Sequence, residues 1–243
     1  MAFKRFVFGT DSHGDMICKE TAKKFLKFVD DYKPHHKIHG GDVFDFRPLR
    51  GGCGNEEKSE SMRNDLMMGL DFISAYKPTD ILLGNHDDRL WQKASSKTDG
   101  VMRDLCGSLV SQIECHKDWN KANVLPYDSR LGVLKLGDLQ FIHGYNAGLN
   151  ACKQAIQVYK GSGTGVIMGH VHQFSTCEDR SLNRAVGISC GALCQLDMPY
   201  NKTNTAKLGH ANGWIFGEIH SSGEWEAWNV RKSGKIWLNP IKK

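Results

Sequence analysis

Five short polar segments of this sequence carry side chains that can hold metal ions and transfer protons. They are Asp11-x-His13, Gly41-Asp42-x-x-Asp45, Gly84-Asn85-His86-Asp87, His143-Gly144 and Gly169-His170-x-His172. Two cations in one site need ligands of mixed oxygen and nitrogen type, and a carboxylate can bridge them because it has two oxygens. The segments supply carboxylates, imidazoles and one amide carbonyl, but no thiolate of the kind that closes a structural zinc site. The set therefore predicts a site for a pair of divalent cations.

Each segment taken alone also has a simpler explanation. Asp11 could cap the helix that follows it, Asp42 could belong to a turn, and His143 could be a hydrogen-bonded histidine at a strand end. Gly169-His170-Val171-His172 is a stronger signal, because alternate residues of an extended segment rarely both need imidazole. All five segments in this order at strand ends are hard to explain by structure alone, so we favour the metal site.

Each polar segment follows a short apolar run that is typical of a strand, and helical patterns separate the early runs. The strands expected before or between the segments are Phe3–Gly9, Lys37–His39, Asp80–Leu83, Val124–Leu125, Leu131–Leu136, Leu139–Ile142 and Val166–Met168. The helices expected are Met16–Tyr32, Met62–Tyr76, Ala147–Tyr159 and Asp88–Ile113, the last broken near Gly100 and Gly107, whereas Arg47–Ser59 is expected to be an exposed loop. The remaining strands expected are Ala185–Ser189, Trp214–His220, Trp225–Val230 and Ile236–Leu238.

This order of elements, βαβαβ followed by mostly strands, predicts the fold class. It indicates an α/β protein in which two sheets pack face to face as a β-sandwich with helices outside, a four-layer α/β/β/α arrangement. A length of 243 residues suits a single domain, 1–243. Sites of α/β sheets lie at the carboxyl ends of the strands, which is where the polar segments fall.

Composition and charge add weaker constraints. The net charge of +5 suits an acidic substrate but is not the dense basic patch of a dedicated nucleic-acid binder. No apolar run approaches the ~20 residues of a membrane helix, and Phe6–Phe8 is too short for a signal peptide. The eight scattered cysteines indicate free thiols in a reducing, cytoplasmic compartment, with Cys190 and Cys194 expected in a buried strand.

The five segments together resemble the signature of the calcineurin-like metallophosphoesterases, and in particular small bacterial and bacteriophage members. The resemblance spans Asp11 to His172. It implies that one metal is bound by Asp11, His13 and His172, and that the other is bound by Asn85, His143 and His170. It implies that Asp42 bridges both metals and that a hydroxide held between them attacks phosphorus. The cofactors implied are two divalent ions, with Mn²⁺ expected first and Fe, Zn²⁺, Ni²⁺ or Mg²⁺ as alternatives.

The same resemblance gives roles to the remaining motif residues. His86 is expected to be the general acid that protonates the leaving oxygen, and Asp45 the carboxylate that orients it. Asp87 is not a ligand in this scheme, and capping of the following helix is at least as good an explanation. Protein phosphatases of the superfamily carry a phosphate-gripping Arg after the second Asp of G-D-x-x-D. Here Phe46 stands at that position, and Arg47 follows as a candidate substrate-binding residue or a solvated loop arginine.

The departure at Phe46, the mildly basic charge and the compact chain favour a phosphodiesterase that acts on nucleic acid or nucleotides. A phosphomonoesterase acting on a small molecule or a protein is the alternative, and a non-catalytic metal-binding scaffold is the third hypothesis. The polar, basic loop Tyr200–Asn212 is expected to overhang the site and to shape the choice of phosphate-ester substrate. No membrane partner is expected, and the sequence does not indicate an oligomeric state.

Overall fold

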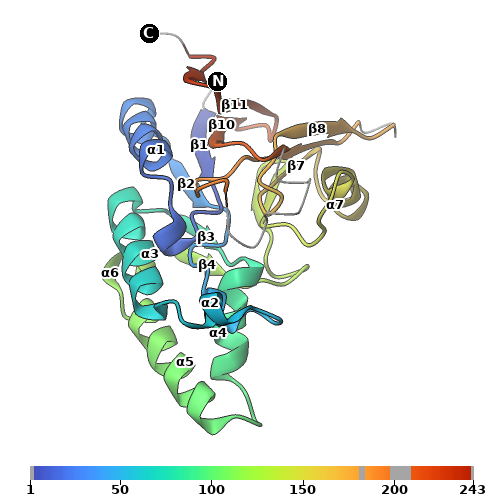
Figure 1. Cartoon of the computed structure of the whole chain (residues 1–243). Helices are drawn as coiled ribbons and strands as arrows, with labels where there is room; N and C mark the ends of the chain where they lie inside the picture. The colour runs from blue at the N-terminus through green and yellow to red at the C-terminus, as the bar shows by residue number, and fades with distance from the viewer. Residues whose placement is uncertain (1–2, 181–183, 198–208, 242–243) are drawn as a thin grey trace.

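Two β-sheets that pack face to face form the centre of the computed structural model, which describes residues 3–180, 184–197 and 209–241 (Figure 1). The first sheet has the strand order β12-β11-β10-β1-β2-β3-β4, and the second has the order β5-β6-β7-β9-β8. The strands of the first sheet are β1 (Phe3–Gly9), β2 (His36–His39), β3 (Asp80–Leu82), β4 (Asn123–Leu125), β10 (Gly213–His220), β11 (Trp225–Ser233) and β12 (Ile236–Leu238). Those of the second are β5 (Leu134–Leu136), β6 (Leu139–Ile142), β7 (Gly165–Met168), β8 (Ser175–Glu178) and β9 (Val186–Ser189).

Strand direction decides where the polar segments emerge. Strands β1, β2, β3 and β4 run parallel to one another, as do β6, β7 and β9. The carboxyl ends of parallel neighbours lie at one edge of a sheet, so the loops that follow them are brought together.

The central strands are buried on both faces, which explains their nearly continuous apolar sequences. In β1, Phe6 and Phe8 point between the sheets and pack with Phe141 of the second sheet, at ring centroid distances of 5.1 and 5.8 Å. Val7 points the other way, into the cluster beneath the helices. One strand therefore contributes to two layers of the core.

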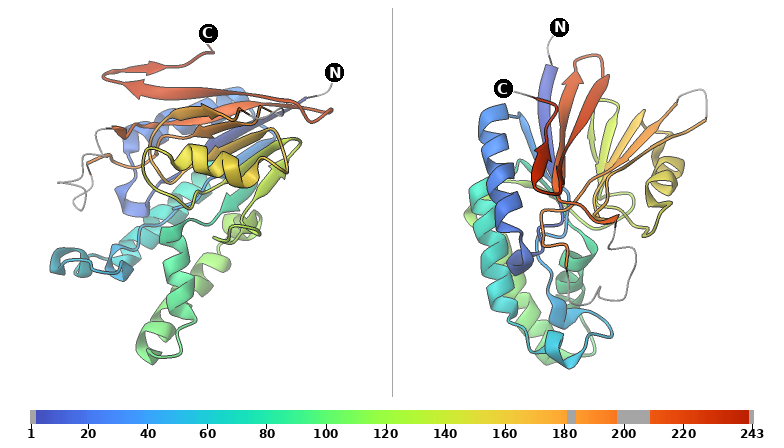
Figure 2. Two further views of the ribbon diagram at one scale, coloured as in Figure 1. Left: turned by 90° about the vertical axis from the view of Figure 1, so that its right-hand side faces the viewer. Right: turned by 45° about the horizontal axis from the view of Figure 1, so that its top comes forward.

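Helices cover the outer face of each sheet. Helices α1 (Lys19–Tyr32) and α3 (Met62–Tyr76) lie against the first sheet. The ring centroids of Phe25 and Phe28 of α1 are each 5.5 Å from that of Trp214. Helix α7 (Ala151–Tyr159) covers the second sheet and buries Cys152 and Ala155 against it. The views in Figure 2 show the helix, sheet, sheet and helix side by side. The predicted four-layer α/β architecture is confirmed.

The region from 85 to 120 departs from the predicted single broken helix. It forms α4 (Asn85–Ala94), α5 (Gly100–Glu114) and α6 (Lys117–Asn120), and the first two project below the sheets in Figure 1. The break lies between α4 and α5, because the Asp99 side chain accepts a 3.0 Å hydrogen bond from the backbone N–H of Met102 and caps α5. Gly107 does not break α5, which runs through it from Gly100 to Glu114.

The segment 47–59, expected to be an exposed loop, is exposed over much of its length but is not a plain loop. It contains a 3₁₀ helix, η2 (Arg47–Leu49), and a short helix, α2 (Asn55–Lys58), and buries Leu49 and Cys53. Ion pairs from Arg47 and Arg50 to acidic side chains hold this segment down, which composition could not reveal.

Two further differences concern the second sheet. Strand β8 was not predicted, because three of its four residues are exposed and polar contacts rather than apolar alternation hold it beside β9. Cys190 and Cys194 are buried as expected, but the strand ends at Ser189 and the two cysteines lie in the connection that follows. Within the described part of the chain, no helix is long and apolar enough to cross a membrane.

Candidate metal centre

The five polar segments meet at one edge of the sandwich. Those containing Asp11, Asp42 and Asn85 follow β1, β2 and β3, and those containing His143 and His170 follow β6 and β7. Contacts between the loops join the two sheets here. The Gly40 carbonyl accepts a 2.8 Å hydrogen bond from His143 Nδ1, and Asp11 Oδ2 accepts one of 3.1 Å from the His170 backbone N–H. The structure thus places all seven predicted metal ligands in one region.

Asp11, His13 and His172 form a first cluster. His172 Nε2 lies 3.3 Å from both His13 Nε2 and Asp11 Oδ1. Asp11 Oδ1 is buried and has no hydrogen-bond partner, and two ring nitrogens face each other beside it. A cation shared by these three atoms would satisfy them all, so the donor set fits a divalent metal.

Asn85, His143 and His170 form a second cluster. His143 Nε2 lies 3.2 Å from Asn85 Oδ1, and the rings of His143 and His170 are 5.2 Å apart between centroids. Because the Gly40 carbonyl can only accept, His143 carries its proton on Nδ1 and turns Nε2 toward the cluster. Burial lowers the pKa of His170 to about 4, which keeps that imidazole neutral and able to bind a metal.

Asp42 lies between the two clusters. Its Oδ2 is 3.9 Å from His13 Nε2 of the first and 3.3 Å from His143 Nε2 of the second. Burial alone would raise the pKa of the Asp42 carboxyl, but the charges of His143 and His86 hold it well below its usual range. Likewise, burial alone would lower the pKa of His143, yet the charge of Asp42 raises it to about 9. An ionised carboxylate therefore faces both clusters.

The backbone at these loops is strained. A left-handed backbone (φ between 51 and 70°) occurs at five predicted ligands, namely Asp11, His13, Asp42, His170 and His172. Such a conformation costs a residue with a side chain about 1–3 kcal/mol and collects at functional sites. Two glycines make room for the donors. A Cβ on Gly84 would lie 2.0 Å from Asp42 Oδ1, and one on Gly41, with φ of 102°, would lie 2.4 Å from His143 Nδ1.

His86 and Asp45 form a pair beside the clusters. The His86 Nδ1–H donates to Asp45 Oδ1 at 2.6 Å, and His86 Nε2 lies 4.0 Å from Asp42 Oδ2. Burial alone would raise the pKa of the Asp45 carboxyl, but its contacts with His13 and His86 hold it well below its usual range. Asp45 Oδ1 is also 3.5 Å from His13 Nδ1, so one carboxylate serves two imidazoles.

Arg47 is not a solvated loop arginine. Its side chain is only 5% exposed, and its guanidinium contacts the carboxylates of Asp15, Asp45 and Glu60. Each nitrogen of the guanidinium therefore already has a carboxylate partner. These contacts hold the side chain in place, and a role of Arg47 in binding substrate stays a prediction.

Two buried aspartates that were not predicted as ligands hold the loops. Asp87 accepts hydrogen bonds from the backbone N–H groups of Gly84, Phe44 and Val43, at 2.9, 2.9 and 3.2 Å. Asp65 accepts 2.6 and 3.2 Å hydrogen bonds from the backbone N–H groups of Phe46 and Asp45. Asp87 therefore caps α4, as one of its two explanations supposed, and also joins two ligand loops. Asp65 gave no sequence signal, since it lies within an ordinary helical pattern.

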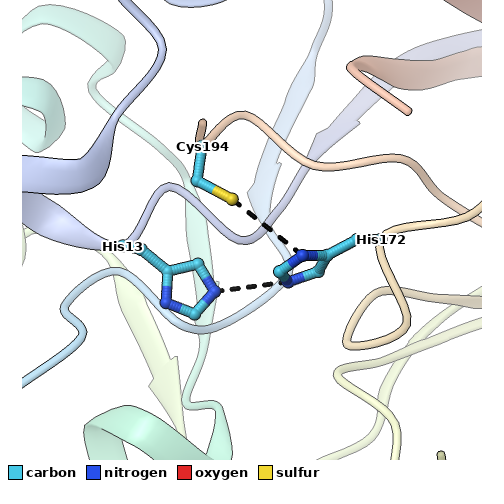
Figure 3. Close-up of side chains that lie close together, drawn as sticks. All are labelled: His13, His172 and Cys194. Atoms are coloured by element: carbon cyan, nitrogen blue, oxygen red, sulfur yellow. Dashed lines mark hydrogen bonds between the residues drawn. The ribbon is translucent and has the colours of Figure 1, made fainter. Parts of the chain in front are cut away.

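Cys194, which the sequence predicts in a buried strand and not in the site, lies next to the first cluster. Figure 3 shows its thiol next to His172, on the side of the ring away from His13. Its Sγ lies 4.0 Å from His172 Nδ1, whereas His172 Nε2 faces His13. His210 also reaches this ring, with its centroid 5.1 Å from that of His172. Of the loop Tyr200–Asn212, residues 200–208 lie outside the described part of the chain.

The chain has a two-sheet α/β/β/α fold whose strand ends carry a candidate centre for divalent metals. No protein-family model and no curated protein sequence matches the chain. Among solved structures, it is similar to a phosphatase from Mycoplasma pneumoniae, with 12% identity, 99% of this chain and 96% of that one covered, and a TM-score of 0.53. It is also similar to Vps29 from Entamoeba histolytica, solved with Zn²⁺, with 14% identity, 96% of each chain covered and a TM-score of 0.50. The fold expected from the calcineurin-like resemblance is confirmed.

Proposed function

We propose that this protein is a metal-dependent phosphoesterase that uses two divalent cations to hydrolyse phosphodiesters of nucleic acid or nucleotides. The observation that carries the proposal is the position of Asp42. One of its oxygens faces imidazoles of both clusters, at 3.9 Å from His13 and 3.3 Å from His143. A carboxylate in that position suits a bridge between two cations.

In this proposal Asp11, His13 and His172 hold one cation, Asn85, His143 and His170 hold the other, and Asp42 contacts both. Bound cations would offset charge on the phosphoryl oxygens and make water a competent nucleophile near neutral pH. Mn²⁺ is the metal that we propose first, with Fe, Zn²⁺, Ni²⁺ and Mg²⁺ as alternatives. Oxygen and imidazole donors accept all of these ions.

His86 is the proposed general acid. Its Nδ1–H is committed to Asp45, so Nε2 is the nitrogen that can give a proton to the leaving oxygen. The side chain is 13% exposed, which leaves it within reach of a bound ester, whereas the neighbouring Asp42 is buried. Asp45 fixes the ring orientation and stabilises the protonated imidazole.

The choice of a diester over a monoester is supported by the pairing of Arg47, although Arg89 Nη1, 3.2 Å from His86 Nδ1, is a second cationic group beside the site. A monoester dianion needs more positive charge than a diester, and Arg47 is already paired with carboxylates. The fold likeness to a phosphatase supports the monoester alternative.

We place the protein in the cytoplasm because its eight cysteines are free thiols.

Turnover assays on purified protein test the proposal. The chelator-treated protein, reloaded separately with each of the five metals, is offered bis-p-nitrophenyl phosphate, p-nitrophenyl phosphate, DNA and RNA. We expect metal-dependent hydrolysis with higher kcat/KM for the diester. In His86→Ala we expect an unchanged metal content and a kcat on DNA or RNA, whose alkoxide leaving group needs a proton, that is lower by about 10²–10⁴-fold. Preference for the monoester would favour the alternative, and absence of turnover with every metal and ester would leave only the scaffold hypothesis.

A further inference from the structure

Both oxygens of the Asp45 carboxylate are held. Oδ1 accepts the 2.6 Å hydrogen bond from His86 Nδ1, and Oδ2 accepts one of 2.9 Å from Arg47 Nη1. Asp45 is fully buried, so no solvent competes for either oxygen. Arg47 is therefore the group that determines how this carboxylate is turned.

Arg47 is itself anchored from the opposite side. Its Nη2 donates to Asp15 Oδ1 at 2.8 Å, and its Nε donates to Glu60. The second oxygen of Asp15 accepts a 3.1 Å hydrogen bond from Asn64 Nδ2 of α3. The guanidinium is thus fixed between an acidic pair on its outer side and Asp45 on its inner side.

The backbone that leads into Arg47 is fixed as well. Phe46 adopts a left-handed conformation with φ of 44°, and the Asp65 carboxylate accepts hydrogen bonds from the N–H groups of both Asp45 and Phe46. This turn buries the Phe46 side chain and directs Arg47 toward Asp45.

We propose that Arg47 is a positioning residue for the His86–Asp45 pair and does not bind the phosphate of the substrate. This inference rests on the proposed function, in which His86 is the general acid. A second imidazole nitrogen, His13 Nδ1, lies 3.5 Å from Asp45 Oδ1. A carboxylate that could rotate would therefore alternate between hydrogen bonds to His86 and to His13. Arg47, by holding Oδ2, keeps Oδ1 on His86 and keeps His86 Nε2 directed at the leaving oxygen.

The kinetic test compares leaving groups. An alkoxide, as released from a dinucleotide, needs a proton from the general acid, whereas p-nitrophenolate leaves with little assistance. In Arg47→Met we expect kcat for the dinucleotide to fall by about 10–100-fold, the range for a misplaced catalytic group. For bis-p-nitrophenyl phosphate the loss is expected to be only a few-fold, and KM to stay nearly constant for both. A general loss of structure would lower both rates equally.

Two further variants separate the explanations. Glu60→Gln weakens the outer anchor of Arg47 without touching Asp45, and we expect the same pattern at smaller size. Arg50→Met is the matched control, because Arg50 lies on the same segment but pairs with Glu57, and its kinetics should equal those of the wild type.

A readout without turnover uses NMR on protein equilibrated with Zn²⁺. The 2.6 Å hydrogen bond should give a downfield imidazole N–H resonance that is absent in His86→Ala. We expect this resonance to disappear or to move upfield in Arg47→Met and to persist in Arg50→Met. Thermal melts of each variant check that it is folded.

The outcomes are distinct. A raised KM with unchanged kcat in Arg47→Met, or equal losses for both leaving groups, would show that Arg47 does not act through His86. A resonance that is unchanged in Arg47→Met would overturn the inference as well, even if the wild-type protein hydrolysed no ester. A wild-type protein that hydrolysed no ester would count against the proposed function alone. The imidazole resonance would still show whether Arg47 positions His86.

Discussion

Replacing Asp87 by Ala is expected to destabilise the protein strongly, although Asp87 is not expected to touch a metal. Its fully buried carboxylate is the acceptor for the backbone N–H groups of Gly84, Phe44 and Val43. Alanine leaves three buried donors without a partner. Each such donor costs about 1–3 kcal/mol.

The expected size follows from two opposing effects. Three unpaired donors at the lower end of that range give about 3 kcal/mol. We take the lower end because the carboxylate is itself costly to bury. Burial and the nearby charge of Asp42 raise the pKa of Asp87 to about 7. Asp87→Asn retains one oxygen that can accept two of the three hydrogen bonds, so one donor is left unpaired and we expect about a third of the loss.

Urea unfolding in the presence of a chelator measures this effect apart from metal binding. With an m-value of about 3 kcal/mol/M, Asp87→Ala should lower the midpoint by about 1 M. The neighbouring Asp88 is the control. Its side chain accepts a hydrogen bond from Gln92 one turn later on α4, so Asp88→Ala should cost less than about 1 kcal/mol. Equal midpoints for Asp87→Ala and the wild type would refute the accounting of buried donors.

Three other expectations concern the same region. Asp42→Ala should abolish binding of both cations, seen as loss of metal after gel filtration, because each cluster depends on that carboxylate; two retained metals would contradict its bridging position. Cys194→Ala should weaken metal binding by about 10–100-fold in chelator competition, because it removes the contact to the second nitrogen of His172, whereas the buried Cys190→Ala should leave affinity unchanged. Burial raises the pKa of Asp65 to about 7 in the folded state, above the usual value of an aspartate, so the stability that it contributes is present below about pH 4 and is lost as the pH rises through 7. In metal-free protein the stability advantage of the wild type over Asp65→Asn should therefore shrink between pH 4 and 8, and a growing advantage would reverse the sign.

The positions of the ligands could be predicted because they depend on strand direction. A polar segment that follows an apolar run must emerge at the strand end, and parallel strands bring such ends together. The sequence alone therefore predicts that Asp11, Asp42 and His143 lie near one another. Their roles as ligands stay predictions.

What the sequence could not supply was the surroundings of these residues. Arg47 was expected in solvent because its segment is rich in Gly, Arg and Glu, yet pairing with Asp15 and Glu60 buries it. Partners that lie more than ten residues away leave no local pattern. The same is true of Cys194, which reaches His172 through a connection without regular structure, and of β8, whose residues lack apolar alternation.

Each proposed ion would draw donors from both sheets of the sandwich. The first would join Asp11 and His13, which follow β1, to His172, which follows β7. The second would join Asn85, after β3, to His143, after β6. A pair of cations would then cross-link the two sheets at this edge. The free energy of metal binding would include the cost of holding the two sheets at a fixed separation. The aromatic rings packed between the sheets, such as Phe141 against Phe6, would set that separation. They would thereby influence metal binding and turnover without contacting the substrate.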